Sequence, residues 1–421
     1  MKGTQTRLFM GRDELGHRSE TVRRANLSAI LRALHGSGPL SRSDLVSRTG
    51  LTRSAIRALT GELVAGDLAL EGPAALDGTP GRPSPLVRVD PHGAVVVALE
   101  IAVDSLAAAT VGLGGEVFDH LRVDLPRRRT DVNDIATALA GLAAAVRADL
   151  PAGDLIVGVG VAIVGVVRRS DGMVSMAPNL GWRDEPLGER LTAALGPLGS
   201  SVPVHFANES DLAVLAESRR GVARTFQDVV MVWGSIGVGG GLIVGGAPLT
   251  GAAGYSGELG HIPVNPDGLS CRCGSTGCWE TEVGIGAVLR RAGYPPEGGM
   301  EAFRSVLEEA GAGSSRALEA FAETGRWLGI GLAGIINVLN PGLVILGGQL
   351  VRSYPFVRSA LEAELDRRVL RASRQIVRVV PATLGLDAPL LGAAELAFEP
   401  LLTDPAAWLR PRTAMADLAT A

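Results

Sequence analysis

Lysine, cysteine and aromatic residues are scarce in this sequence, and the shortages narrow the classes of protein that it can encode. Lys2 is the single lysine, and all other basic side chains are arginines, a bias that coding preference explains more simply than nucleic-acid binding. Aromatic residues make up only 4% of the chain, against 46% hydrophobic residues. A core built from Ala, Val, Leu and Ile favours layers of helices and strands over an aromatic-rich β-sandwich.

The chain also lacks a long uninterrupted apolar run. Residues 1–24 are polar and charged, without the apolar stretch of a secretory signal. The longest apolar segment, Trp327–Leu346, is interrupted by Asn337, Asn340 and Pro341, and it predicts a buried helix followed by a short strand. We therefore expect a cytoplasmic protein that does not contact the membrane. Its 421 residues suffice for two or three domains.

The charge is distributed unevenly along the chain. Residues 1–90 carry 13 basic and 9 acidic side chains, whereas the remainder carries 27 basic and 35 acidic ones. A modestly basic head on an acidic body is typical of a DNA-binding module joined to a soluble one.

All three cysteines lie within Gly257–Glu280, and a histidine precedes the first of them by ten residues. One imidazole and three thiolates make a complete tetrahedral zinc set: His261, Cys271, Cys273 and Cys278. Three incidental cysteines are the alternative, but an odd trio packed into eight residues beside a histidine favours zinc in a reducing cytosol. Zinc would pin this loop and hold the carboxylates of Glu258 and Glu280 near the metal.

Residues 21–90 have the pattern of a winged helix-turn-helix domain, and residues 1–20, which lack apolar periodicity, are expected to be a flexible arm. Apolar residues at i, i+3, i+4 and i+7 predict a first helix: Leu27, Ile30, Leu31 and Leu34. Ser41 and Asp44 can form a capping box that opens a second helix, and Thr52 can cap a third. Two short helices joined by a glycine-containing turn form a helix-turn-helix, with the later one as recognition helix.

Exposed residues at the start of the third helix are candidates for contact with base edges and phosphates: Thr52, Arg53, Ser54 and Arg57. Asp67–Glu71 and Leu86–Val89 predict a hairpin. Its Gly/Pro-rich tip carries Arg82, which can reach the DNA backbone or the minor groove. An ordinary three-helix domain with solvated arginines is the alternative, and the hairpin favours a DNA-binding wing.

From Gly93 onward the pattern changes to short strands with glycine turns, followed by a helix and a strand at Leu155–Ala162. The same order recurs: Val229–Trp233 and Gly241–Val244 are predicted strands, helices follow, and Leu343–Leu346 is another buried strand. A repeated strand-rich unit with a helical crossover predicts an α/β body of two similar lobes around a cleft. Ligands in such folds bind where the lobes and the strand ends meet.

The motif GELGH, followed by CRCGSTGCWE, resembles the signature of the ROK family, which contains bacterial sugar kinases and sugar-responsive repressors. The resemblance implies the actin-like, ribonuclease-H-like fold of sugar kinases for residues 91–400, with a zinc loop at 257–280. It also implies three contacts to sugar hydroxyls: Glu258, His261 and Glu280. One imidazole can ligate zinc and face a hydroxyl, because both ring nitrogens need partners.

Two further segments resemble sugar-side motifs of the family. Asn208 and Glu209 begin a predicted helix and match the family's Asn-Asp pair, which binds sugar and supplies the catalytic base, although a helix cap is the ordinary role of such an asparagine. Pro178–Trp182 resembles a sugar-side loop, which makes Asn179 a candidate contact. Arg23–Leu63 resembles the head of the family's repressors, such as the N-acetylglucosamine and xylose repressors, which the kinases lack.

The nucleotide side departs from the pattern of a kinase. Glu209 stands at the base position, and its extra methylene displaces the carboxylate by about an ångström. The first phosphate loop corresponds to Glu100–Asp104, which has no glycine and turns Asp104 toward a phosphate of like charge. The second, Ser235–Gly241, keeps most glycines but has Ile236 where a hydroxyl is expected, and such glycines also serve tight hairpins. We therefore expect ATP chemistry to be lost.

These features predict a sugar-responsive, DNA-binding transcriptional regulator, a repressor of carbohydrate genes that contains structural zinc and has no enzyme activity. The expected partners are a double-stranded DNA operator and a sugar or sugar phosphate, bound by a homodimer or homotetramer. Residues 401–421 are expected to form a peripheral tail. Two alternatives stay open: an ATP-dependent sugar kinase with a fused head, and a regulator controlled by a protein partner with a vestigial sugar site.

Overall fold

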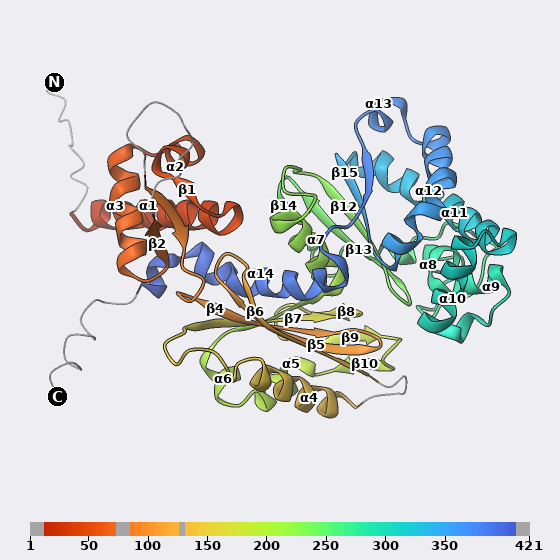
Figure 1. Cartoon of the computed structure of the whole chain (residues 1–421), viewed down its shortest axis with the longest axis horizontal. Coiled ribbons are helices and arrows are strands. Elements are labelled where there is room, and N and C mark those ends of the chain that lie inside the picture. Colours follow the sequence, from red (N-terminus) through yellow and green to blue (C-terminus); the bar gives the residue numbers. More distant parts are fainter. Residues whose placement is uncertain (1–11, 73–84, 126–130, 410–421) are drawn as a thin grey trace, which may run out of the picture.

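Residues 12–72 and 85–89 form a head of three helices and a small antiparallel sheet (Figure 1). The structure is a computed structural model and describes residues 12–72, 85–125 and 131–409. The strands of the head pair in the order β1-β3-β2. Its elements are α1 (Arg12–Ser37), β1 (Leu40–Ser41), α2 (Arg42–Thr49), α3 (Arg53–Ala65), β2 (Ala69–Gly72) and β3 (Leu86–Val89).

The helix caps, the turn and the apolar faces predicted for the head are all present in the structure. The Ser41 hydroxyl accepts from the amide of Asp44 while the Asp44 carboxylate accepts from the Ser41 amide, so the capping box at α2 is confirmed. Gly50 ends α2 with a left-handed φ of 70°, and Thr52 caps α3. The predicted apolar faces of α1 and α3 are buried: Leu27, Ile30, Leu31, Leu34, Ile56, Leu59 and Leu63.

The start of the head differs from the expectation of an arm over residues 1–20, because α1 begins at Arg12. Glu20 accepts hydrogen bonds from Arg23 at 2.9 Å and from Arg24 at 3.2 Å. These pairs add to the stability of the helix just after the missed part. Residues 12–20 themselves have no apolar periodicity, the signal on which the prediction relied. The predicted hairpin forms between β2 and β3, but its tip with Arg82 lies outside the described residues.

The first lobe of the body contains a mixed five-stranded sheet in the order β11-β7-β4-β5-β6. Strands β11, β7 and β4 are parallel, whereas β5 and β6 extend the sheet in antiparallel fashion. Its elements are β4 (Val95–Ile101), β5 (Ser105–Gly112), β6 (Val117–Asp124), α4 (Val132–Ala145), β7 (Ile156–Ile163), β8 (Val166–Val167), β9 (Val174–Ala177), β10 (Trp182–Glu185), α5 (Leu187–Ala194), α6 (Pro197–Ser201), β11 (Val204–Asn208) and α7 (Glu209–Arg220).

The second lobe repeats this topology. Its sheet has the order β14-β13-β12-β15-β16, with β12, β15 and β16 parallel and β13 and β14 antiparallel. The predicted duplication is therefore confirmed at the level of strand order. Its elements are β12 (Val229–Gly234), β13 (Val238–Val244), β14 (Ala247–Pro248), α8 (Trp279–Val283), α9 (Ile285–Ala292), α10 (Gly299–Gly311), α11 (Ser315–Leu339), β15 (Leu343–Gly348), α12 (Gln349–Arg368), α13 (Arg371–Arg374) and β16 (Arg378–Pro381).

The longest apolar segment of the sequence forms the second half of α11 and then β15, as predicted. The helix ends at Asn340, which caps it in the left-handed conformation with a φ of 47°. None of the helices in the described part of the chain is both long and apolar enough to cross a membrane.

The C-terminal helix α14 (Ala388–Thr403) lies between the head and the sheet of the first lobe (Figure 1). Residues of α1, α3, β4, β5 and α14 belong to one continuous hydrophobic core. Leu401 and Leu402 are buried in it, and a 3-10 turn at Pro405–Trp408 contacts α1. The expectation of a peripheral tail from residue 401 is therefore wrong for these residues, because α14 must continue to reach the head.

Helices α7 and α14 approach each other closely enough for their backbones to touch. A Cβ atom on Gly392 would lie 1.9 Å from the carbonyl oxygen of Leu212. Only glycine fits at such a distance, since real contacts of a Cβ atom are longer than 3.0 Å. Gly392 therefore fixes the spacing between the two helices.

We expect Gly392→Ala to lower the free energy of unfolding by about 1–3 kcal/mol, because the added methyl group must push α7 and α14 apart. Gly141→Ala in α4 is the matched control, since no atom lies within 4 Å of its added Cβ and alanine favours a helix by about 1 kcal/mol. Urea unfolding of both variants measures the difference. Equal stabilities would contradict the close contact.

Candidate functional site

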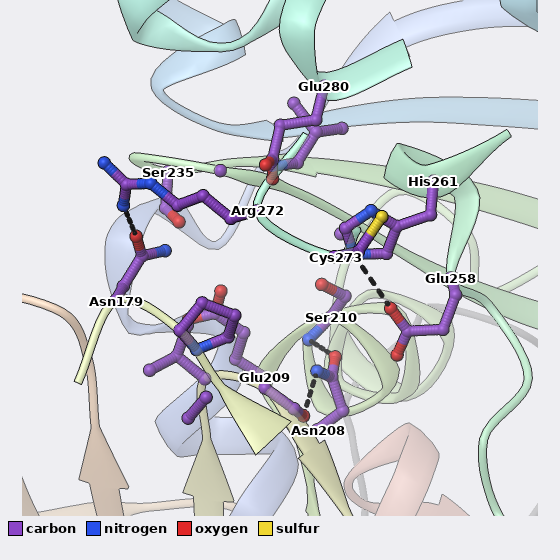
Figure 2. A pocket seen from close by; sticks show the side chains of 17 residues that line it. Asn179, Asn208, Glu209, Ser210, Ser235, Glu258, His261, Arg272, Cys273 and Glu280 are labelled. Atoms are coloured by element: carbon purple, nitrogen blue, oxygen red, sulfur yellow. Dashed lines mark hydrogen bonds and ion pairs between the residues drawn. The ribbon is translucent and has the colours of Figure 1, made fainter. Parts of the chain in front are cut away.

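A cavity between the two lobes brings together the six residues that the sequence nominated for sugar contact (Figure 2). They come from the β9–β10 loop, the start of α7, the loop around the 3-10 turn at Leu259–His261, and the start of α8. They are Asn179, Asn208, Glu209, Glu258, His261 and Glu280. Polar groups from separate parts of the chain thus converge on one small volume, as in ligand-binding sites.

Asn208 has a structural role at the rim of this cavity. Its side-chain oxygen accepts from the amide of Ser210 at 2.7 Å and caps α7, as the ordinary interpretation of the sequence holds. Its side-chain nitrogen donates to the carbonyl of Gly165 at 2.9 Å. The amide group is therefore fixed in orientation while it lines the cavity.

Glu209 is buried at the start of α7 and is best described as a neutral carboxyl group. Burial and, next, the nearby charge of Glu100 raise its pKa to about 8, although a hydrogen bond from Ser235 opposes the shift. A carboxyl group that keeps its proton at neutral pH can donate one hydrogen bond and accept others. Such a group is suited to a sugar hydroxyl.

The motif GELGH packs directly on strand β13. A Cβ atom on Gly260 would lie 2.0 Å from the carbonyl oxygen of Val238, so the motif needs glycine there. This contact turns Glu258 toward the cavity, where burial raises the pKa of its carboxyl group. Glu280, which also lines the cavity, accepts a hydrogen bond from the Val238 amide at 3.0 Å.

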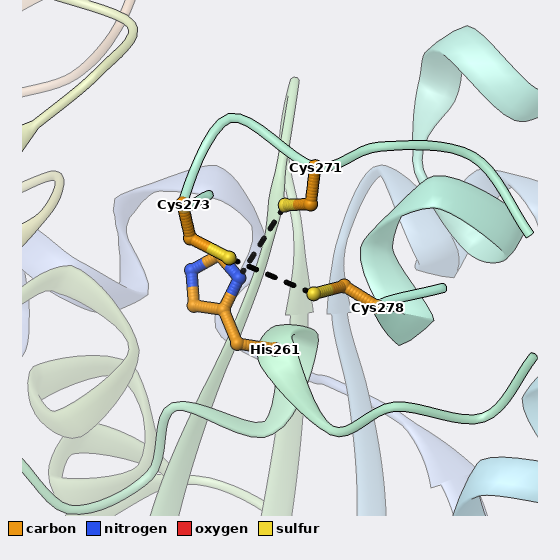
Figure 3. Close-up of side chains that lie close together, drawn as sticks. All are labelled: His261, Cys271, Cys273 and Cys278. Carbon is orange, nitrogen blue, oxygen red and sulfur yellow. Dashed lines mark hydrogen bonds between the residues drawn. The ribbon is translucent and has the colours of Figure 1, made fainter. Parts of the chain in front are cut away.

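The His261 imidazole joins the cavity to a cluster of three thiols (Figure 3). Its Nε2 atom lies 3.8 Å from a carboxylate oxygen of Glu258, whereas Nδ1 lies 3.7 Å from the sulfur of Cys271. The sulfurs of Cys273 and Cys278 are 3.6 Å apart. All four potential ligand atoms lie within 4.8 Å of one another.

These distances fit a tetrahedral metal site. Thiolates held about 2.3 Å from a zinc ion at tetrahedral angles lie about 3.8 Å apart, close to the observed spacing. The loop reaches this arrangement because Gly277 has a left-handed φ of 70° and a Cβ atom there would lie 1.6 Å from the Asn265 carbonyl oxygen. The predicted ligand set can therefore hold a metal ion.

Sequence reasoning missed three residues that line the cavity: Ser210, Ser235 and Arg272. The Arg272 guanidinium donates to the side-chain oxygen of Asn179 at 2.8 Å and joins the loops of the two lobes (Figure 2). The position of Arg272 between two predicted zinc ligands could have identified it as a residue near the cavity. The Ser210 hydroxyl is buried without a hydrogen-bond partner in the described chain, a free polar group that no sequence pattern announces.

A second cavity adjoins the first and shares Glu209 and Ser235 with it. It contains the Glu100–Asp104 segment, in which Glu100 is buried and accepts a hydrogen bond from Arg122 at 2.8 Å. The glycines after Ser235 form the tight hairpin between β12 and β13, where Gly234 pairs with Val238.

On the head, the candidate DNA contacts lie together at the start of α3. All four are exposed, and the hydroxyls of Thr52 and Ser54 are 3.1 Å apart. Arg53 and Arg57 form no ion pair with the described part of the chain. Arg82, the fifth candidate, is not among the described residues.

A model of the ROK family matches residues 96–399. The chain belongs to the ROK family. Its body accordingly has the actin-like sugar-kinase fold that the sequence predicted, with two mixed sheets.

ROK proteins of two kinds are similar to this chain. It is 32% identical over 325 residues to a glucokinase of Streptomyces coelicolor, covering 73% of this chain and 98% of the glucokinase. It is 26% identical over 387 residues to the xylose repressor of Bacillus subtilis, covering 90% and 97%. A crystal structure of a ROK-family transcriptional regulator, a homologue of the E. coli MLC protein, matches with a TM-score of 0.74 and 25% identity, covering 91% and 97%.

The repressor and the glucokinase match different lengths of this chain, and the difference shows which relatives share the head. Residues 96–421 make up 326 residues of the chain, so an alignment that covers 90% of it must include much of the head. The match to the glucokinase, at 73%, can be accommodated by the body alone. The head is therefore shared with the xylose repressor and with the transcriptional regulator.

We expect Glu209→Gln to change the pH dependence of stability. The raised pKa means that the folded chain keeps this proton up to about pH 8, whereas the unfolded chain releases it near pH 4.5. The stabilising effect of the neutral group is thus complete below pH 4.5 and is lost as the pH rises to 8. Relative to the wild type, the Glu209→Gln variant should gain at least about 1.4 kcal/mol between about pH 5 and about pH 8, the value of one pKa unit.

Chemical unfolding at both pH values measures this gain, with Glu189→Gln on the exposed side of α5 as the control. A difference between Glu209→Gln and the wild type that does not vary with pH would contradict the neutral state of Glu209.

Proposed function

We propose that this chain is a transcriptional repressor of carbohydrate genes whose affinity for its DNA operator changes when a sugar binds between the two lobes. Two observations together support the proposal. The residues that match the family's sugar-side motifs line one cavity. The same chain also has a head that it shares with a xylose repressor and a transcriptional regulator. A body alone would be compatible with either kind of ROK protein.

The cavity is suited to a sugar because it offers several fixed hydrogen-bonding groups close together. The side chains of Asn179 and Asn208 are held by neighbouring groups, and Glu209 is neutral while Glu280 accepts from the backbone. A ring with many hydroxyls needs such a mixture of donors and acceptors. We assign the sugar contacts to these four residues together with Glu258 and His261.

The head is suited to the major groove of DNA. Thr52, Arg53, Ser54 and Arg57 form an exposed, basic start of α3, the position at which a recognition helix meets base edges. Arg82 in the hairpin tip would add a wing contact. A homodimer would place two such helices about 34 Å apart on a two-fold operator.

Zinc is the metal that we assign to His261, Cys271, Cys273 and Cys278. Four protein ligands leave no open position, which is characteristic of a structural zinc ion. The metal would hold the loop that carries Arg272 and precedes Glu280, both of which line the cavity. The imidazole would keep Nε2 free to face Glu258 and a sugar hydroxyl.

An ATP-dependent sugar kinase with a fused head is the second candidate, because identity to the glucokinase is 32%. The composition of the adjoining cavity argues against it. Glu100, Asp104 and Asp124 line it, and no glycine between Glu100 and Asp104 lets the backbone approach a phosphate. Arg122, Arg304 and Arg352 line the same cavity and offset the charge of these carboxylates, so the missing glycine is the observation that speaks against a kinase.

The proposal predicts that a sugar stabilises the protein and that Mg·ATP does not. The zinc-loaded chain is heated with D-glucose, D-xylose, N-acetyl-D-glucosamine and their phosphates, each with and without Mg·ATP. A ligand at a hundred times its dissociation constant adds about 2.7 kcal/mol. The same sugar should change the affinity for DNA selected by the protein from a random library, which fluorescence anisotropy measures.

Sugar-dependent production of ADP would instead establish the kinase. Binding of DNA without any response to the sugars would favour a regulator controlled by a protein partner.

We expect Cys273→Ser to remove most of the bound zinc and to weaken the sugar response. One zinc ion per wild-type chain and clearly less in the variant are the expected results of elemental analysis. Ser270→Ala, which changes an exposed residue of the same loop that is not a ligand, should keep both zinc and response. A full sugar response in zinc-free Cys273→Ser would remove the metal from the mechanism.

A further inference from the structure

Beside the shared hydrophobic core, a layer of charges along α14 also joins the head to the body. Two carboxylates of this helix, Glu395 and Glu399, lie one turn apart and face both the head and the end of α7. Each of them is shared between one cationic or hydrogen-bonding residue of α1 and one arginine of α7. No other described carboxylate of α14 joins these two helices.

Glu395 is the buried member of the pair. One of its oxygens lies 3.0 Å from Nε2 of His35 in α1, and the other accepts a hydrogen bond from Arg220 at the end of α7. Burial alone would raise the pKa of Glu395, but His35 and Arg220 outweigh it and lower the pKa to about 2. The His35 ring is fixed on its other side, where Nδ1 accepts from the Gly114 amide at 3.0 Å.

Glu399 repeats the arrangement nearer the surface. The Arg32 guanidinium of α1 donates to both of its oxygens, at 3.1 and 2.7 Å. Arg219 of α7 lies 3.5 Å from one of these oxygens. The head and α7 are thus joined twice through α14, first by a buried contact and then by a half-exposed one.

Helix α7 connects this junction to the cavity. It has 12 residues, a length of about 18 Å, and its first residues line the cavity while its last two are the arginines of the junction. Glu217, buried near its end, accepts hydrogen bonds from the amides of Thr383 and Leu384 at 2.6 and 2.8 Å. Leu212 against Gly392 and Glu217 against Thr383 and Leu384 tie α7 to α14 and to the loop before it, so a displacement of the start of α7 is carried along the helix.

We propose that α7 transmits sugar binding to the head, and that Glu395 and Glu399 are the contacts through which it does so. The inference rests on the proposed function and adds the route by which the two sites communicate. A sugar that displaces the start of α7 moves Arg219 and Arg220. The shared carboxylates pass this movement to His35 and Arg32, and Arg220 also contacts His35 directly, with Nη2 2.8 Å from Nε2. Coupling of this kind needs a contiguous element that both sites touch.

Arg219→Gln tests the route on the full chain. It removes the contact of α7 with Glu399 and leaves the Arg32–Glu399 pair and the cavity intact. Arg24→Gln is the matched control, because Arg24 pairs with Asp404 at 3.0 Å and so joins the head to the body without involving α7. Glu395→Gln, which keeps the size of the side chain, tests the buried contact.

The probes are D-glucose, D-xylose and N-acetyl-D-glucosamine, and the DNA is the fragment selected by the wild-type protein. Arg219→Gln and Glu395→Gln should bind the stabilising sugar with a dissociation constant within twofold of the wild type. In both, the sugar-induced change in DNA affinity should shrink at least threefold, whereas Arg24→Gln should keep it.

A full sugar-induced change in Arg219→Gln would overturn the inference, as would an equal loss in Arg24→Gln. Should Glu395→Gln not fold, Arg219→Gln decides alone, since Arg219 is more exposed. Failure of the wild type to bind a sugar or DNA is a different result, because it removes the proposed function itself.

Discussion

The backbone contact between α7 and α14 is the constraint on which both ends of this molecule depend. Because nothing separates Gly392 from the carbonyl of Leu212, the two helices cannot slide without unpacking the core. One of them begins at the cavity between the lobes, and the other supports the head. The position of the head is therefore set by the same packing that places Asn208 and Glu209 in the cavity.

Much of the fold could be predicted because local rules decide it. The caps at Ser41 and Thr52 and the buried stripe of α1 follow from residue type and spacing alone. The early start of α1 was missed because residues 12–20 have no apolar periodicity, which was the signal used. Burial of Leu401 and Leu402 depends on a helix that joins the two ends of the chain, and no local pattern contains that information.

The site residues that belong to a sequence motif could be predicted, whereas those that only the fold brings to the cavity could not. All six nominated sugar residues line one cavity, since the motifs carry them. Ser235 and Ser210 enter the cavity only because β12 and α7 meet there. The neutral state of Glu209 likewise depends on burial and on Glu100, which is more than a hundred residues away in the sequence.

The shared core of the head and the first lobe has a consequence for the exchange of parts between ROK proteins. The interface that seats the head is made from segments far apart in the sequence, since α1 packs on α14 and on the turn at Pro405–Trp408. A chimaera cut only near residue 90 would place a foreign head on a surface shaped for another one. The natural unit of transplantation is the head together with α14, two segments separated by about three hundred residues of sequence.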